Sequence, residues 1–213
     1  GRINLIISHL VSSKVLNLVP DYSDRSVESA YPRGTHRPVN MLQGLNLSRI
    51  NLGALNLAGF NLSRADLRFS NLKRSALTDA NLRNASLNFA DLGGSRADKS
   101  DFRGADMDAV NLSMSRLDRA EFGPDPDAIL NDQQSNAPTT KMNRAKIVGS
   151  SLVRAKIGRS EIRNANLAGS NLIGADMRGA DLRGSSLKNA KVDKTTRFDN
   201  ALTDGAVLPL IQK

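Results

Sequence analysis

A large apolar residue returns at nearly every fifth position through most of this chain. The first run starts at Leu42 and ends at Phe122, and 16 of its 17 positions are Leu, Met or Phe, with Ala97 as the exception. The same register resumes at Met142 and continues to Val192, and all 11 positions of this second run are apolar. A fixed period repeated so often indicates a repeat architecture, in which each unit packs on its neighbours.

A period of five residues fits neither an α-helix nor a flat β-strand. Five helical steps of about 100° leave successive leucines about 140° apart, so no single face of a helix becomes apolar. In a strand, side chains alternate between the two faces, and an odd spacing would place successive leucines on opposite sides. A chain that turns a corner after every five residues returns each leucine to the inside. The period therefore predicts a solenoid whose stacked coils enclose a column of leucines.

A second inward position lies two residues before each large one and is nearly always Ala or Ser. Such residues must be small because stacked coils lie only about 4.8 Å apart. Four exceptions form one block, Leu45, Ile50, Leu55 and Phe60, which indicates a coil of four sides and 20 residues. The gap from Phe122 to Met142 is also 20 residues and agrees with this coil length.

These units resemble the pentapeptide-repeat family, whose consensus is A-(D/N)-L-x-x. Ala65-Asp66-Leu67-Arg68-Phe69 and Ala180-Asp181-Leu182-Arg183-Gly184 follow it, and the resemblance covers residues 40–208 in 28 in-register units. It implies an all-β fold, namely a right-handed quadrilateral parallel β-helix of about seven to eight coils, in a bacterial protein. It also implies a surface for binding or mimicry, because enzymes are not the rule in this family.

The repeat pattern divides the chain into four parts. Residues 1–39 form a head that we expect to cap the first coil, either as a short helix or as a divergent coil. Residues 40–122 are the first block of the β-helix, residues 123–141 break the pattern and predict a projecting loop, and residues 142–208 are the second block. The frame slips by one residue near Thr196 and Phe198. The apolar end up to residue 213 is expected to be a cap over the last coil or a dimer contact.

Residues 20 positions apart should lie directly above one another in such a coil. Arg49, Phe69 and Phe89 are therefore expected to form an outward stack on one corner. Exposed stacked aromatic rings stabilise neighbouring coils and can also offer a patch to a partner. We treat these three residues as candidate interaction residues.

The formal net charge of +9 is distributed unevenly along the chain. Residues 1–97 carry +6, residues 98–140 carry −5, residues 141–163 carry +6 and residues 164–213 carry +2. The densest basic stretch spans about one coil and should encircle the solenoid, so it is either a solvated belt or a patch that binds an anion. The candidate residues of this basic belt are Lys141, Arg144, Lys146, Arg154, Lys156, Arg159 and Arg163.

The side chains that support catalysis or metal binding are scarce. The chain has no Cys, and its two His residues, His9 and His36, both lie in the head. Asp125, Asp127 and Asp132 are spaced loosely like a calcium loop, but Leu130 and Asn136 stand where such a loop needs Gly and Glu. We therefore expect neither an enzyme nor a bound cofactor or metal.

No run approaches the roughly 18 apolar residues that a membrane-spanning helix needs. Residues 1–19 are apolar but are interrupted by Ser, His and Lys, so we do not expect a cleaved signal. These features favour the cytoplasm.

The sequence supports one main hypothesis of function and three alternatives. The main one is a non-enzymatic, rigid scaffold for protein–protein interaction that acts through the solenoid faces and the 123–141 loop. The family resemblance suggests a DNA mimic that interacts with a type II topoisomerase such as gyrase. A mimic of the DNA phosphates would need a rod with an acidic surface. The basic belt suggests a binder of nucleic acid or another polyanion. The last alternative is a translocated bacterial effector, which rests on analogy within the family.

Overall fold

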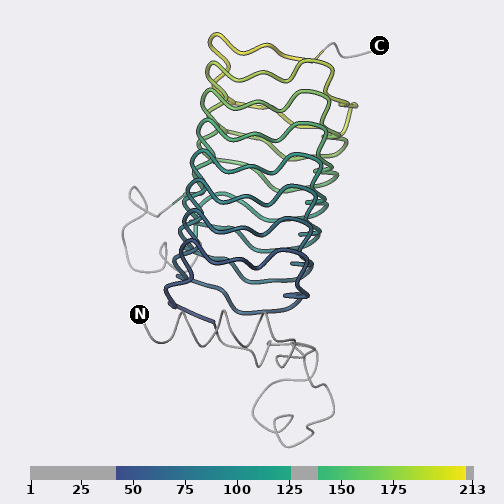
Figure 1. Cartoon of the computed structure of the whole chain (residues 1–213). Coiled ribbons are helices and arrows are strands. Elements are labelled where there is room, and N and C mark those ends of the chain that lie inside the picture. Colours follow the sequence, from purple (N-terminus) through teal and green to yellow (C-terminus); the bar gives the residue numbers. More distant parts are fainter. Residues whose placement is uncertain (1–41, 126–138, 210–213) are drawn as a thin grey trace, which may run out of the picture.

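The structure is a computed structural model, and it describes residues 42–125 and 139–209. Over these residues the chain winds into a tall column of stacked, four-sided coils (Figure 1). It is a right-handed quadrilateral parallel β-helix of between seven and eight coils, as the repeat predicts. The head, residues 126–138 and the last four residues lie outside the described part, so the two expected caps and most of the expected loop stay predictions. In the described part, no helix is long and apolar enough to cross a membrane.

Every side of a coil consists of five residues with fixed roles: a small inward residue, an outward residue, a large inward residue and two corner residues. No extended strand forms in the described ranges, because each side contributes a single parallel bridge through its outward residue. Asn46 pairs with Asp66 and Asn61 pairs with Asn81, and the partners are 20 positions apart. The coil length of 20 residues is therefore confirmed.

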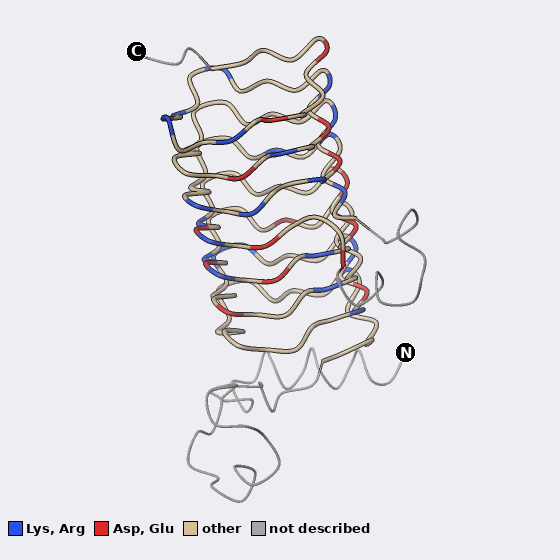
Figure 2. Ribbon diagram, turned by 180° about the vertical axis from the view of Figure 1, so that it is seen from behind, with Lys and Arg blue, Asp and Glu red and all other residues tan. Residues whose placement is uncertain are grey.

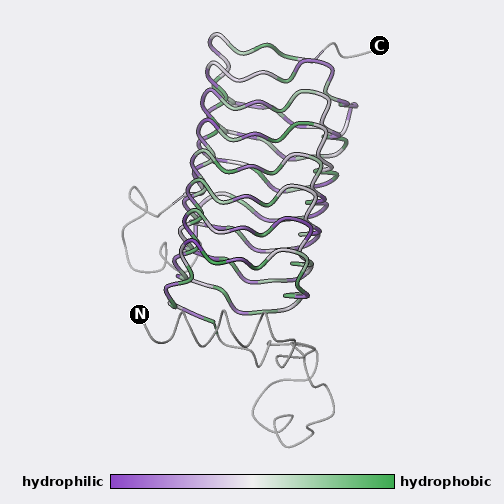
Figure 3. Cartoon of the chain, in the orientation of Figure 1, coloured by the Kyte–Doolittle hydropathy of each residue, from purple (hydrophilic) through white to green (hydrophobic). Residues whose placement is uncertain are grey.

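We name the four faces by letters, from the large inward residue of one coil. Face A contains Leu62, face B Leu67, face C Leu72 and face D Leu77. Corners AB, BC, CD and DA lie between the faces, with Ser63 and Arg64, for example, at corner AB. Figure 3 shows that apolar and polar segments alternate along every coil, as this division of roles requires.

The core is a continuous column of large inward residues, from Leu47 to Leu187, nearly all of them fully buried. Phe102 and Phe122 lie on successive coils of face A and stack inside the column with ring centroids 5.1 Å apart. Most inward serines are tolerated because their hydroxyls find backbone acceptors, and only Ser95 and Ser160 among the described ones lack such a bond. Ser75, for example, donates to the Leu72 carbonyl at 2.8 Å, and Ser100 donates to the Leu77 carbonyl at 2.5 Å.

The corners explain the polar part of the repeat. The second corner residue has a positive φ, and 18 of these residues are not glycine, with φ between 55° and 61°. Together with bonds such as Ile50 N–H to the Leu47 carbonyl, this is the geometry of a type II turn. The outward Asn or Asp accepts a bond from the backbone N–H two residues later, as Asn51 does from Gly53 at 3.1 Å. A short polar side chain is therefore favoured at this position.

The interruption adds 15 residues to a coil, and not 20. Asp106 pairs with Lys141 and Glu121 pairs with Lys156, so these partners are 35 positions apart instead of 20. Met142 therefore occupies the place that normally lies five residues after Phe122. The 20-residue gap therefore does not represent one coil, and its agreement with the coil length is a coincidence.

The expected slip of one residue near the C-terminus is confirmed. Asp176 pairs with Arg197 and Asp181 pairs with Leu202, each at a separation of 21 positions. Asp193 is the extra residue, and its carboxylate accepts bonds from the Thr195 and Gly174 backbone N–H groups at 3.0 and 3.3 Å. The side chain thereby ties the widened turn to the coil before it.

Candidate interaction surfaces

Arg49, Phe69 and Phe89 lie one above the other on corner BC, as the coil length predicts. The rings of Phe69 and Phe89 are parallel within 3° and their centroids are 5.1 Å apart. The Arg49 guanidinium carbon lies 5.3 Å from the centroid of Phe69, which is a cation–π contact. Phe69 and Phe89 are nevertheless 51% and 58% exposed, so the stack presents ring surface to solvent as well as bracing neighbouring coils.

Face C adjoins this stack and carries mainly uncharged outward residues in its first four described coils. These residues are Asn51, Asn71, Asp91 and Asn111. The Asn71 amide donates to Asn51 at 2.9 Å, and the Asn111 amide donates to Asp91 at 2.9 Å. Lys73 pairs with Asp91 at 2.9 Å. The result is a flat, hydrogen-bonded strip of amides with an aromatic edge.

The seven residues of the basic belt lie on different sides of the solenoid. Lys141 is on face B, Lys146 on face C and Lys156 on face A, while Arg154 is on corner DA and Arg159 on corner AB. Arg144 and Arg163 both lie on corner BC, on successive coils. Seen from behind, Lys and Arg positions are spread over many coils and interleaved with Asp and Glu (Figure 2). One partner on one side could therefore contact only part of the belt.

Two belt residues are paired with acids of neighbouring coils. Lys156 pairs with Glu121 at 2.6 Å, and Arg163 pairs with Asp181 at 2.5 Å. These ion pairs between coils partly neutralise the belt, because each coil faces the coils before and after it. Whether any belt residue contacts a partner stays a prediction.

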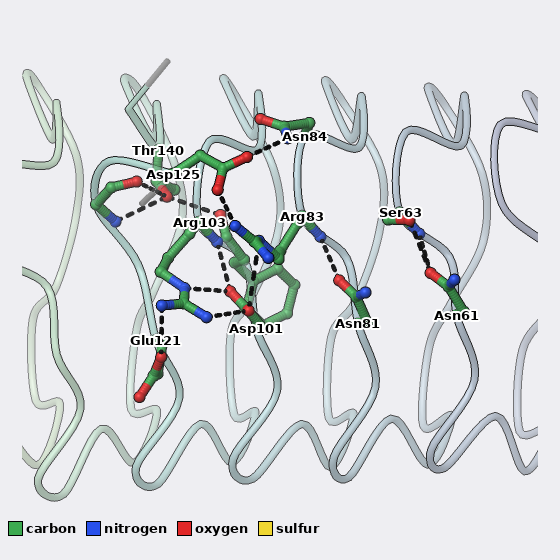
Figure 4. Close-up of polar contacts among 12 residues, drawn as sticks. Asn61, Ser63, Asn81, Arg83, Asn84, Asp101, Arg103, Glu121, Asp125 and Thr140 are labelled. Atoms are coloured by element: carbon green, nitrogen blue, oxygen red, sulfur yellow. Dashed lines mark hydrogen bonds and ion pairs between the residues drawn. The ribbon is translucent and has the colours of Figure 1, made fainter. Parts of the chain in front are cut away.

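The base of the 123–141 segment is held by a charged cluster on corner AB (Figure 4). Asp125 is nearly buried and forms an ion pair with Arg83. Its other oxygen accepts a bond from the Asn84 amide at 2.6 Å. Arg83 and Asn84 lie two coils before Asp125. At the same corner of the intervening coil stands Gly104, which has no side chain to separate them from Asp125. The chain therefore folds back along the corner as it leaves the solenoid.

The same cluster continues along face A. Asp101 accepts a bond from the Arg103 guanidinium at 2.5 Å and lies 3.7 Å from Arg83. Arg103 also lies 3.3 Å from the Glu121 carboxylate. These alternating charges bridge three successive coils next to the point where the chain leaves them.

Thr140 closes the solenoid where the chain returns. It is fully buried in a small inward position. Its hydroxyl donates to the Phe102 carbonyl at 2.7 Å and accepts the Gly123 N–H at 2.9 Å. The Gly123 carbonyl in turn accepts N–H bonds from Gly104 and Thr140. The two ends of the insertion are thus joined by backbone and side-chain bonds.

Sequence reasoning did not find this anchor. One sequence signal could have indicated it: Asp125 occupies an inward position where the repeat has Ala or Ser. Its partners Arg83 and Asn84 look like ordinary corner residues, and only the stacking of coils brings them close. The loosely spaced Asp127 and Asp132 lie outside the described residues, and no group of metal-ligating side chains occurs within the described ones.

Asp181 fastens two coils of face B. It accepts bonds from Arg183 on its own side at 2.8 and 2.7 Å and from Arg163 at 2.5 Å. The bonds from Arg183 hold the pKa of the Asp181 carboxyl well below its usual range, burial opposes this effect, and the bond from Arg163 reinforces it. A carboxylate with a lowered pKa stabilises the fold above its unfolded pKa and loses this effect as the pH falls through its folded value.

We expect Asp181→Asn to lower the free energy of unfolding by about 1–3 kcal/mol at neutral pH, because two Arg side chains lose a charged acceptor. The difference from the wild type should shrink below about pH 4, where the unfolded carboxyl becomes protonated. Urea unfolding monitored by circular dichroism, at neutral pH and below about pH 4, measures this difference in free energy. Asp176→Asn is the matched control, since Asp176 bonds mainly to Arg178 on its own side. Equal effects of the two substitutions at neutral pH would contradict a role in joining coils.

Further apolar side chains are exposed on other corners and at the C-terminal end. Met114 on corner CD is 72% exposed, and Ile173 on corner DA is 37% exposed. Leu202, Val207 and Leu208, in the last described coil, are 48–54% exposed. The dimer contact expected from this apolar end stays a prediction.

The comparisons with known proteins agree with the repeat geometry. The family model described as pentapeptide repeats matches residues 46–84, 85–123 and 160–196 with 8 copies. No curated protein is a match. Among solved structures, HetL, described as a pentapeptide repeat protein involved in heterocyst differentiation regulation in the cyanobacterium Nostoc sp. strain PCC 7120, is 23% identical. The match covers 87% of this chain and 94% of HetL, with a TM-score of 0.32.

Two other solved structures are similar at the same level. Rfr23, a pentapeptide repeat protein from the cyanobacterium Cyanothece 51142, is 23% identical over 78% of this chain and 90% of its own, with a TM-score of 0.27. QnrB1, a plasmid-mediated fluoroquinolone resistance protein, is 15% identical over 78% of this chain and 90% of its own, with a TM-score of 0.29. Because the family model covers more than half of the chain in the register of the observed coils, this protein belongs to the pentapeptide-repeat family.

Proposed function

We propose that this protein is a non-enzymatic, rigid scaffold that binds a partner protein through its outer surface. The main contact is corner BC with the adjoining face C, and the 123–141 loop is a second contact. The observation that carries the proposal is the exposed stack of Phe69 and Phe89 beside a strip of amides. Large aromatic side chains dominate the energy of protein interfaces, and the amides supply hydrogen bonds around them.

The rigidity of the solenoid supports this role. Phe69 and Phe89 are fixed by their mutual stacking and by backbone bonds to the next coil, such as Phe69 N–H to the Asn88 carbonyl at 3.1 Å. A partner would therefore not have to order these side chains on binding, which saves about 0.5–1.5 kcal/mol for each. The loop gains from the same scaffold, because Asp125 and Thr140 fix its two ends on corner AB.

The arrangement of the acidic residues weighs against a DNA mimic that binds a type II topoisomerase. Mimicry requires free carboxylates along the rod. Asp66, Asp101 and Asp176 each accept bonds from the Arg two residues later on the same side. Nothing among the described residues favours a translocated effector. A binding scaffold for a protein is the function that the surface supports best.

The proposal predicts that capture of a specific partner depends on the aromatic stack. Immobilised wild type and the Phe69→Ser/Phe89→Ser variant are exposed to a lysate of the source organism, and bound proteins are quantified by mass spectrometry. A partner of corner BC should be depleted about tenfold or more with the variant. Met114→Ser is the control, since it removes an exposed apolar side chain on another corner. Identical captured proteins for all three baits would contradict the proposal.

The loop can be tested by a deletion that keeps the register of the coils, although it also removes Asp125 and its bond from Asn84. Removing residues 124–138 places Thr139 directly after Gly123 and restores the five-residue step from Phe122 to Met142. Thr139 would then occupy the corner position with positive φ, so Thr139→Gly should accompany the deletion. A partner of the loop should be lost with this variant, while a partner of corner BC is kept.

A further inference from the structure

We propose that corner DA carries a second binding site, which takes an extended acidic segment of a partner protein. Its centre is a column of three cations on successive coils, Lys99, Arg119 and Arg154, which we call the DA column. This inference shares with the proposed function only the premise that the chain is a binding scaffold. It concerns the corner diagonally opposite the aromatic stack, so either proposal can fail without the other.

The backbone fixes the spacing of the DA column. The Lys99 N–H donates to the Asp118 carbonyl at 2.9 Å, and the Arg119 N–H donates to the Val153 carbonyl at 2.9 Å. Each cation is therefore one coil from the next, or about 4.8 Å. All three are second corner residues with φ of 61°, 60° and 57°, so their side chains leave the corner in the same way. All three are exposed.

The acids beside the DA column do not form ion pairs with its cations. Among the described residues, none of the three side chains forms an ion pair. Asp79 precedes Lys99 by one coil in the same column, since its N–H donates to the Asp98 carbonyl at 3.0 Å, and among the described residues it forms no ion pair. The other two neighbouring acids, Asp98 and Asp118, are engaged elsewhere. Asp98 lies 3.4 Å from the Arg116 guanidinium and accepts the Asp118 N–H at 3.2 Å. Asp118 accepts the Ser151 hydroxyl at 2.5 Å and the Val153 N–H at 3.1 Å.

The DA column differs from every other outward column of the described coils. Elsewhere no more than two cations follow one another, and one or both of them have an acidic partner. Arg83 and Arg103 share Asp101, and Arg163 and Arg183 share Asp181. Like charges stacked on neighbouring strands destabilise a sheet. Three stacked cations therefore cost stability, which Asp79 offsets only beside Lys99 and which an anionic ligand would restore.

Neighbouring residues define the shape of the site. Arg96 lies beside the column on face D and extends its positive surface. Arg116, the next residue of that face, pairs with Asp98 and Asp118 at 3.4 and 4.0 Å. At the C-terminal end, Val153 and Ile173 take the corner positions that Asp98 and Asp118 occupy in earlier coils, and Ile173 is 37% exposed. Figure 2 shows Lys and Arg on consecutive coils along one edge of the solenoid. The site is a basic strip that ends in an apolar patch.

An extended acidic peptide fits this strip better than a nucleic acid does. Three coils span about 14 Å, which four or five residues of extended chain cover at about 3.3 Å each. Carboxylates would bind the two Arg and the Lys, and an apolar side chain would cover Ile173. Single-stranded nucleic acids bind through aromatic platforms, and the exposed aromatic rings of the described residues lie on corner BC.

Fluorescence anisotropy tests the site with a labelled peptide of sequence Glu-Asp-Glu-Asp-Glu-Ile-Val. We expect saturable binding that weakens as salt increases and disappears with the uncharged peptide Gln-Asn-Gln-Asn-Gln-Ile-Val. The variant Lys99→Glu/Arg119→Glu/Arg154→Glu should bind about tenfold or more weakly. Circular dichroism shows whether this variant folds. If it does not fold, the variant Lys99→Gln/Arg119→Gln/Arg154→Gln is used in its place.

The matched control is Arg64→Glu/Arg74→Glu/Arg144→Glu. These exposed arginines also have positive φ, but they lie on corners AB, CD and BC. The change in net charge is the same, so a site on corner DA predicts less than about a threefold loss. Equal losses in the two variants, absence of peptide binding, or binding of labelled oligothymidylate but not of the peptide would each overturn the proposal. The Phe69→Ser/Phe89→Ser variant should bind the peptide normally whether or not corner BC binds a partner.

Discussion

Replacing Phe102 by Ala is expected to lower the free energy of unfolding by about 3–5 kcal/mol. Phe102 is fully buried and stacks on Phe122 with ring centroids 5.1 Å apart, so the substitution opens a cavity in the middle of the column. The loss should be large because each coil is stabilised only by its neighbours, and a weakened coil separates the two halves of the stack. Chemical unfolding monitored by circular dichroism measures the change.

Phe69→Ala is the matched control for this prediction. Phe69 stacks on Phe89 at the same centroid distance and with nearly the same ring orientation, but on the outside of corner BC. Because it is 51% exposed, its loss should cost about 1 kcal/mol or less. If the two substitutions cost the same, burial would not be the source of the stabilisation that we assign to Phe102.

Replacing Gly123 by Ala should cost about 2–4 kcal/mol, because two separate effects add up. Gly123 has a φ of 106°, a conformation that side chains with a Cβ rarely adopt. A Cβ would also lie 2.5 Å from the Gly158 carbonyl oxygen in the next coil, which is backbone and cannot move aside cheaply. Gly123 lies where the coil opens for the 123–141 segment. We therefore expect the variant to unfold at a lower denaturant concentration and to be cleaved faster by proteases near the insertion.

Gly169→Ala separates the clash from the conformational effect. Gly169 also has a positive φ, of 67°, but a Cβ there would meet no atom within 4 Å. Non-glycine residues occupy this conformation at 18 other corners, so the expected cost is only about 1 kcal/mol. Equal losses at the two glycines would show that the Gly158 carbonyl is not the obstacle.

The repeat itself could be predicted from the sequence because its physical cause is local. Leu52 and Leu72 point inward for the same reason, and the distance between them along the chain equals one coil. The stacking of Phe69 on Phe89 follows from that distance alone. The slip near Thr196 was also visible, because the spacing of small and large residues is kept on both sides of it.

The length of the interruption and the charge pattern of the surface could not be predicted. The gap from Phe122 to Met142 contains one ordinary step as well as the added 15 residues, and only the pairing of Glu121 with Lys156 separates the two. Lys99 and Arg119 belong to a stretch whose net charge is −5. The net charge of that stretch therefore did not indicate the column of cations that they form with Arg154.

The amino-acid sequence alone sufficed to predict the four-sided coil, its inward leucines and the family. These properties depend on spacing within about 20 residues, which a fixed period displays directly. Which charges lie close together became clear only from the stacking of the coils, as in the pairing of Asp125 with Arg83 and the alignment of Lys99, Arg119 and Arg154. The physical reason is that Coulomb interactions depend on distance in space. In a solenoid, the nearest outward neighbours of a residue belong to the coils before and after its own.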